Sequence, residues 1–208
     1  MLEIKTIKSS MLSDFKLSDP YETVIVLPAT QMVLAKKASE VMKERTNQEG
    51  LLLIVEDDLR FGFIMVSNLV YIKTTSRYFG YVAQDAYPGQ LWLDLGLEAI
   101  KTKNGGLLAF SDGRFFGRLA IFGLADRLWL NTIYNGVLFY PEYKAHYGDT
   151  ELSVIAVYAD KLVYDPKCLL IEVDYEKHMT RNNPDDERLF IERAKAGFDG
   201  RVPPFVPG

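Results

Sequence analysis

Three short apolar runs divide the first part of the chain, and each ends abruptly at polar residues. Residues 23–27, 51–55 and 78–83 are continuous hydrophobic segments, a pattern typical of buried parallel strands. Between them, residues 31–46 place apolar side chains at helical spacing, and residues 60–71 predict a second helix. Strand, helix and strand in this order predict a right-handed crossover unit. We therefore expect an α/β fold with a Rossmann-like, mostly parallel central sheet flanked by helices.

The second half of the chain continues this alternation less regularly. The pattern predicts further strands at residues 107–110, 163–164 and 168–173. It predicts further helices at residues 90–101, 152–158 and 184–196. The intervening residues 114–147 are rich in aromatic side chains, which suit a ligand-binding wall and a packing layer about equally.

Composition fits one globular domain with short extensions. We interpret residues 1–22 as an N-terminal lead-in, 23–180 as the domain, and 181–208 as a C-terminal helix with a proline-rich tail. No apolar run approaches the ~20 residues of a membrane helix, and residues 1–16 do not resemble a secretory signal, so we expect a cytoplasmic protein without a membrane span. The single Cys168 excludes an internal disulfide. The net charge of -4 argues against a broad surface for duplex nucleic acid.

Polar loops follow all three of the first apolar runs. Their sequences are Pro28-Ala29-Thr30, Glu56-Asp57-Asp58 and Gln84-Asp85. Because the carboxyl ends of parallel strands converge at one sheet edge, these loops predict a shared ligand site. Asp85 alone, close to Pro88 and Gly89, would be ordinary turn chemistry, but its place as the third such strand end makes it the first candidate for function.

The order of these features resembles the GT-A glycosyltransferases, particularly the family 2-like group that uses nucleotide-sugar donors. Residues 24–30 and 53–58 resemble its first two strands and donor-binding loops, and residues 62–68 resemble its Gly and Arg-Asn stretch. Residues 81–88 fall where that family carries an Asp-x-Asp metal motif, and residues 148–152 fall where it carries an acidic motif with the general base. The metal motif has one acid here, because Gln84 and Ala86 flank Asp85.

The resemblance implies a set of site residues. Asp149 is the expected general base, with Glu151 as second candidate, although Asp149 also stands where a helix N-cap would. Asp85 and His178 are the expected ligands of Mn²⁺ or Mg²⁺, with a surface role as the alternative for His178. His146 is interpreted as a packed side chain. The expected donor contacts are Pro28, Ala29, Thr30, Glu56, Asp57, Asn68, Gln84 and Asp112.

The function implied is transfer of a sugar from a nucleotide-diphosphate donor, expected to be a UDP-sugar, with inversion at the anomeric carbon. The acceptor could be a glycan, a lipid-linked sugar, a protein or a nucleic-acid base. Two alternatives stay open. The incomplete metal motif also fits a noncatalytic nucleotide-sugar binding module. A GT-A-fold nucleotidyltransferase ranks lower, because the chain lacks an early Gly-rich loop for a triphosphate.

Overall fold

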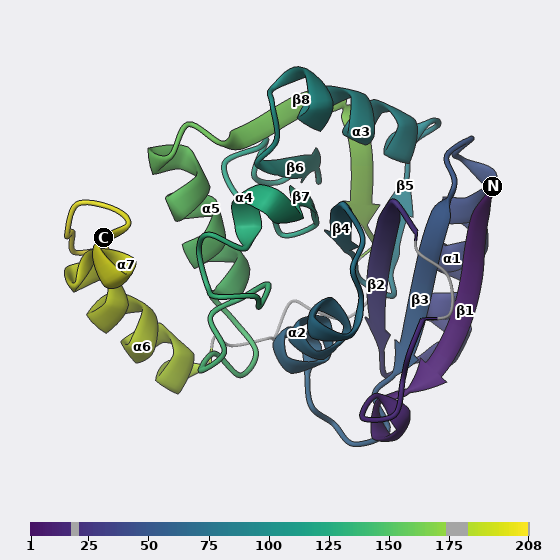
Figure 1. Ribbon diagram of the computed structural model, residues 1–208, viewed down its shortest axis with the longest axis horizontal. Helices are drawn as coiled ribbons and strands as arrows, with labels where there is room; N and C mark the ends of the chain where they lie inside the picture. Colours follow the sequence, from purple (N-terminus) through teal and green to yellow (C-terminus); the bar gives the residue numbers. More distant parts are fainter. Residues whose placement is uncertain (18–20, 174–182, 208) are drawn as a thin grey trace.

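The computed structural model describes residues 1–17, 21–173 and 183–207. Its centre is a set of parallel strands, β2 (Thr23–Ala29), β3 (Gly50–Glu56) and β4 (Tyr78–Tyr81). They are joined through α1 (Met32–Glu44) and α2 (Phe63–Lys73), which confirms the predicted crossover units. In Figure 1, α2 lies in front of this sheet and α1 lies behind it.

An eight-stranded sheet extends from this centre in the order β1-β3-β2-β4-β7-β6-β8-β5. Its pairs are parallel except where β7 lies between β4 and β6, and where β5 pairs with β8. The remaining elements are β1 (Leu2–Lys8), η1 (Ser9–Met11), β5 (Ala86–Pro88), α3 (Trp92–Thr102), β6 (Leu107–Ser111), β7 (Gly123–Asp126), α4 (Arg127–Leu130), α5 (Gly148–Tyr158), β8 (Leu162–Glu172), α6 (Pro184–Lys195) and α7 (Gly197–Gly200).

The strands are apolar on both faces because helices cover both faces of the sheet. Successive side chains of a strand point to opposite faces. Val24 and Val26 therefore pack in one core cluster with residues of α2 and α5, while Ile25 and Leu27 pack in a second cluster with residues of α1 and α3. This double burial explains why the strand pattern is continuous rather than alternating.

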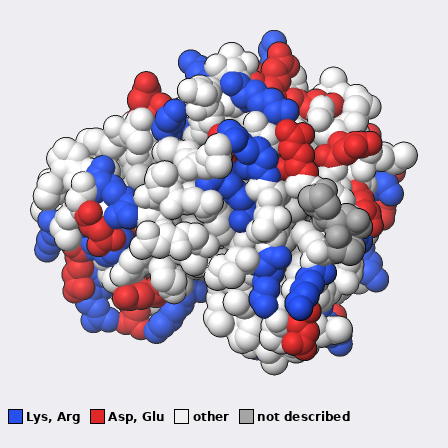
Figure 2. Space-filling view, in the orientation of Figure 1, with Lys and Arg blue, Asp and Glu red and all other residues white. Residues whose placement is uncertain are grey.

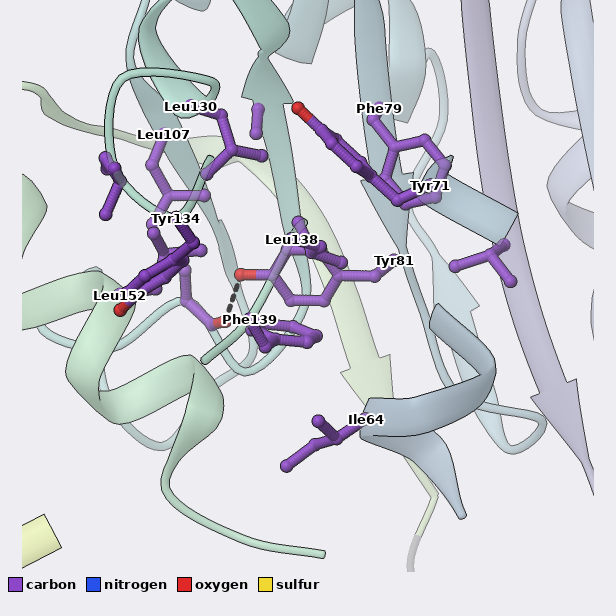
Figure 3. Packing of buried hydrophobic residues seen from close by; sticks show 14 of the residues in the cluster. Ile64, Tyr71, Phe79, Tyr81, Leu107, Leu130, Tyr134, Leu138, Phe139 and Leu152 are labelled. Carbon is purple, nitrogen blue, oxygen red and sulfur yellow. Dashed lines mark hydrogen bonds between the residues drawn. The ribbon is translucent and has the colours of Figure 1, made fainter. Parts of the chain in front are cut away.

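Tyr81 fixes the end of β4, where the chain enters the loop with Gln84 and Asp85. Its ring is fully buried and packs edge-on against Phe139, with ring centroids 5.0 Å apart. The hydroxyl donates a hydrogen bond of 2.7 Å to the backbone carbonyl of Ala120, as Figure 3 shows. A side chain at Gly123 would meet the Tyr81 hydroxyl at 2.5 Å, so this close approach requires glycine.

Three details differ from the sequence predictions. Residues 2–8 of the expected lead-in form β1, which pairs with β3 along its whole length. Pro88 does not lie in a turn that directly follows the third apolar run, because residues 86–88 form β5, which pairs with β8. The two short strands expected between residues 163 and 173 are one strand, β8, whose register shifts where it pairs with β6.

The surface carries charges of both signs. On the face shown in Figure 2, lysine and arginine side chains are interspersed with aspartate and glutamate, and no continuous basic surface is present there. Among the described residues, no helix combines the length and the apolar character needed to cross a membrane.

Candidate active site

A crevice opens at the carboxyl edge of the sheet, beside β2 and β3. After β2 the chain enters α1 on one face, whereas after the neighbouring β3 it enters α2 on the other face. Strand ends whose connections diverge in this way leave room for a ligand. A small cavity of about 180 Å³ lies here, lined by Pro28, Ala29, Thr30, Asp57, Gly62, Phe63, Ala83, Gln84 and Asp85. All three predicted strand-end loops therefore meet, as expected.

Two of the predicted donor residues shape this cavity by holding its loops. The Gln84 Oε1 atom accepts hydrogen bonds from the backbone N–H groups of Thr30 (2.9 Å) and Gln31 (2.8 Å). The Asp57 carboxylate accepts hydrogen bonds from the backbone N–H groups of Phe61 (2.9 Å) and Gly62 (2.8 Å). Gly62 has a φ of +83°, a conformation that favours glycine. The loops are thus fixed before any ligand binds.

The other two acids at the end of β3 contribute differently. Glu56, the last residue of β3, is half-buried and lines neither this small cavity nor the larger cavity that adjoins it. The Asp58 carboxylate accepts hydrogen bonds from the hydroxyl groups of Ser9 and Ser10 and from the Ser10 N–H. These bonds, with that of the Ser10 hydroxyl as the largest cause, lower the pKa of Asp58 to about 2. Asp58 therefore anchors η1 to the end of β3.

A larger cavity of about 690 Å³ adjoins the small one and shares Phe63 and Ala83 with it. Its wall combines apolar side chains with the polar and charged side chains of six residues, Arg114, His146, Tyr147, Asp149, Thr150 and Glu172. The remaining lining residues are Ile64, Phe115, Leu119, Ile121, Phe122, Phe139 and Ala145. The aromatic stretch of residues 114–147 therefore supplies ligand wall and packing layer together.

Asp149 lies in the first turn of α5 and lines the larger cavity. Its Oδ1 atom accepts a hydrogen bond of 2.8 Å from the backbone N–H of Thr150. Burial raises the pKa of Asp149 above the ordinary carboxyl value, although the hydrogen bonds from Thr150 oppose the shift. A carboxylate whose pKa is raised accepts a proton more readily, which suits a general base. The neighbouring Gly148 lets α5 approach α2, because a side chain there would meet Ile64 and Phe139 at 3.2 Å.

Glu151, the second catalytic candidate, lies away from both cavities. Successive helical residues are rotated by about 100°, so residues two apart face nearly opposite sides. Glu151 is fully buried and accepts hydrogen bonds from the Tyr134 hydroxyl (2.8 Å), the Tyr143 hydroxyl (2.7 Å) and the Arg193 guanidinium (2.7 and 2.8 Å). The structure therefore corrects this prediction: Glu151 is a partner in a buried ion pair.

Asn68 and Asp112, two expected donor contacts, also lie outside both cavities. The Asn68 side chain binds the backbone of Leu138 and Phe139, and so supports the Phe139 part of the wall. Asp112 is buried, and its Oδ1 atom accepts hydrogen bonds of 2.9 Å from the N–H groups of Arg114 and Phe115. Neither residue lines a cavity, but each binds the backbone of residues that line the larger one.

The expected metal ligands are only partly described. Asp85 is buried in the loop between β4 and β5 and lines the small cavity, whereas His178 lies outside the described residues. Within the described ranges, no cluster of three or more His, Cys, Asp or Glu side chains is placed to hold a metal ion. One carboxylate still fits a nucleotide-bound cation, because such ions take one or two carboxylates and complete their shell with phosphate and water.

Three charged or polar residues of the larger cavity were not predicted as site residues. Arg114 and Glu172 form an ion pair, with the Arg114 Nη1 atom 3.5 Å from the Glu172 Oε2 atom. His146 lines the cavity three residues before Asp149 and helps to stabilise the charged form of its carboxyl group. Arg114 follows the predicted strand at residues 107–110 by only a few residues, which was the available signal. His146 was interpreted as a packed side chain, whereas it lines the cavity, and Glu172 carried no signal.

Comparisons with known proteins give matches to solved structures but none by sequence. No protein-family description matches the chain, and no curated protein matches its sequence. Among solved structures, S. aureus TarS superposes with a TM-score of 0.61 and 11% identity, covering 83% of this chain and 39% of TarS. The mannosyltransferase PcManGT from Pyrobaculum calidifontis, in complex with GDP-Man and Mn²⁺, has a TM-score of 0.62 and 14% identity. The chain has a GT-A-like fold.

The matches cover most of this chain but a smaller share of each solved structure. The match to PcManGT covers 90% of this chain and 67% of that protein, and a complex of TarS residues 1–349 with UDP-GlcNAc matches 84% of this chain and 64% of that one. The chain thus spans less than half the length of full TarS and about two thirds of the other two structures. At these identities the likeness establishes the GT-A architecture that the sequence resemblance implied.

Proposed function

We propose that the chain is a nucleotide-sugar-dependent glycosyltransferase that inverts the anomeric centre, with Asp149 as general base. The observation that carries the proposal is the position of Asp149. This carboxylate, whose pKa is raised, lines the larger cavity, and that cavity adjoins the strand-end cavity with Asp85. The neighbours TarS and PcManGT were solved with UDP-GlcNAc and with GDP-Man and Mn²⁺, which supports a nucleotide sugar as donor.

The two cavities suit the two parts of a donor. The small cavity, with its fixed loops at Thr30 and Asp57, receives the nucleotide, and Asp85 lies beside the diphosphate. The sugar extends past Phe63 and Ala83, the residues that both cavities share. A divalent cation held by Asp85 would neutralise the charge that develops on the leaving diphosphate.

Asp149 removes the proton of the acceptor hydroxyl as its oxygen attacks the anomeric carbon. The new carbon–oxygen bond forms on the face opposite the donor phosphate, and the bond to the phosphate oxygen breaks with its electron pair. The proton remains on Asp149, and a nucleoside diphosphate leaves. Arg114, a cation in the larger cavity, adds to the charge stabilisation. The apolar wall around Phe115 and Phe139 offers the acceptor a surface from which water is displaced.

The test is a donor panel with the purified chain. UDP- and GDP-sugars are titrated by calorimetry with and without Mn²⁺, and products are identified after incubation with each donor and, in parallel, with each nucleoside triphosphate. We expect one donor to bind more tightly with Mn²⁺ and to release nucleoside diphosphate slowly, and Asp85→Asn to remove the Mn²⁺ effect. Release of pyrophosphate from a nucleoside triphosphate would indicate a nucleotidyltransferase instead. Donor binding without turnover, with Asp149→Asn no different from wild type, would indicate a binding module.

A further inference from the structure

One face of α6 contacts the chain on both sides of Asp149. Asp186, Phe190 and Arg193 recur at i, i+4 and i+7, the spacing that places residues on one side of a helix. All three side chains are buried. Asn183 caps the N-terminus of α6, because its side chain accepts a hydrogen bond of 2.9 Å from the Asp185 N–H. We call these three residues the α6 clamp.

Asp186 holds the loop that precedes Asp149. Its carboxylate accepts hydrogen bonds from three consecutive backbone N–H groups, those of Lys144 (2.9 Å), Ala145 (2.8 Å) and His146 (2.9 Å). Ala145 and His146 line the larger cavity. Burial alone would raise the pKa of Asp186, but these backbone hydrogen bonds outweigh it and lower the pKa. The carboxylate therefore stays charged and keeps the loop fixed at neutral pH.

Phe190 holds the residue at the turn between this loop and α5. Its ring stacks on the Tyr147 ring, with centroids 4.9 Å apart and an interplanar angle of 26°. Tyr147 has a φ of +69°, an unfavourable conformation for a residue with a bulky side chain. Such a conformation persists only where surrounding contacts impose it. The stack on Phe190 is one such contact, two residues before Asp149.

Arg193 holds α5 itself, two residues after Asp149. Its guanidinium donates two hydrogen bonds to Glu151, at 2.7 and 2.8 Å, and lies 3.3 Å from the centre of the Tyr140 ring. It also pairs with Asp199 of α7 at 3.0 Å. The planar, two-bond contact fixes the direction of α5 as well as its distance from α6.

We propose that the α6 clamp positions Asp149, so that the C-terminal helix belongs to the catalytic apparatus although none of its three residues lines the cleft. The inference rests on the proposed role of Asp149 as base. The three contacts hold residues 144–146, 147 and 151, and Asp149 lies within this span. A general base must stand within hydrogen-bonding reach of the acceptor proton, and a displacement of about 1 Å can cost about 100-fold in rate.

The first experiment compares Asp186→Asn with Glu187→Gln in the full chain. Both variants remove one negative charge from the first turn of α6, but Glu187 is exposed. For Asp186→Asn we expect amide hydrogen exchange at residues 144–146 to accelerate at least tenfold. We also expect kcat to fall about 10- to 100-fold with the donor KM within twofold. Glu187→Gln should change none of these values more than twofold.

A second clamp variant, Phe190→Leu, tests the same role without changing the charge of α6. Phe190→Leu keeps position 190 apolar and breaks the ring stack on Tyr147. We therefore expect kcat to fall, as in Asp186→Asn, and the donor KM to stay within twofold. The titration of the Asp149 carboxyl group, followed by NMR, should shift in both clamp variants and not in Glu187→Gln. This last readout requires no sugar transfer.

The outcomes separate the two proposals. If exchange accelerates in Asp186→Asn but kcat and the Asp149 titration stay unchanged in both clamp variants, the positioning role is wrong and the glycosyltransferase proposal stands. If the wild-type chain turns over no donor, the proposed function fails. In that case a shifted Asp149 titration in both clamp variants still supports the clamp, and an unshifted one overturns it.

Discussion

The two sides of the cleft are built in different ways. On the donor side, loops that follow three buried strands meet at one sheet edge, and short contacts such as those of Gln84 and Asp57 hold them. On the Asp149 side, the wall is assembled from segments far apart in the chain. Asn68 binds Leu138 and Phe139, and α6 binds residues 144–151. Parallel-sheet topology explains the donor side, whereas long-range packing creates the Asp149 side.

The largest expected effect is on the Asp149 side. Asp149→Asn removes the general base, and we expect kcat to fall about 10²- to 10⁴-fold. Donor affinity by calorimetry should stay unchanged, because the nucleotide binds on the other side. The control is Asp160→Asn, an exposed residue beyond the end of α5, where asparagine is tolerated at a φ of +52°. Turnover at the wild-type rate in Asp149→Asn would rule out the base assignment.

The next effect concerns stability on the same side. Arg193→Met leaves the fully buried Glu151 carboxylate without its cation, and we expect the free energy of unfolding to fall by about 3–5 kcal/mol. Urea denaturation measures the loss. Arg188→Met is the matched control, because the Arg188–Asp185 pair is exposed and such pairs contribute about 0–1 kcal/mol. Equal losses in the two variants would contradict the buried ion pair.

A smaller effect is expected on the donor side. Gln84→Ala removes the acceptor for the N–H groups of Thr30 and Gln31, so the loop after β2 loosens. We expect the unfolding free energy to fall by about 1 kcal/mol and donor affinity to fall about tenfold. Gln31→Ala removes an exposed amide that makes no side-chain cap bond, and it should leave both values unchanged. A larger loss in Gln31→Ala would show that Gln84 does not hold this loop.

The smallest expected effects concern how stability depends on pH, where Asp149 and Asp186 act in opposite directions. The pKa of Asp149 is raised by folding, so its contribution to stability is lost as pH rises through the folded pKa. Asp149→Asn should therefore increase stability at neutral pH. The pKa of Asp186 is lowered, so its contribution is present above the unfolded pKa and lost as pH falls through the folded one. Asp186→Asn should reduce stability at neutral pH and less in acid. Thermal unfolding across pH checks both signs.

Much of the fold follows from local pattern. The strands β2, β3, β4 and β6 and the helices between them were predictable, because buried runs and helical spacing are properties of neighbouring residues. The short strand β7 was not, because its four residues form a strand only between β4 and β6. Strand β1 carries lysines along an edge of the sheet, and its polar pattern hid its pairing with β3.

The site residues likewise fall into those predictable from local pattern and those placed by long-range packing. The meeting of Thr30, Asp57, Gln84 and Asp85 was predictable from the sequence alone, because parallel strand ends converge wherever such a sheet forms. Long-range packing, in contrast, places Asp149 at the larger cavity and Glu151 against the buried Arg193. Both acids stand in the first turn of one helix, and their roles depend on what packs against each side of it. That choice is made by α6, more than thirty residues further along the chain.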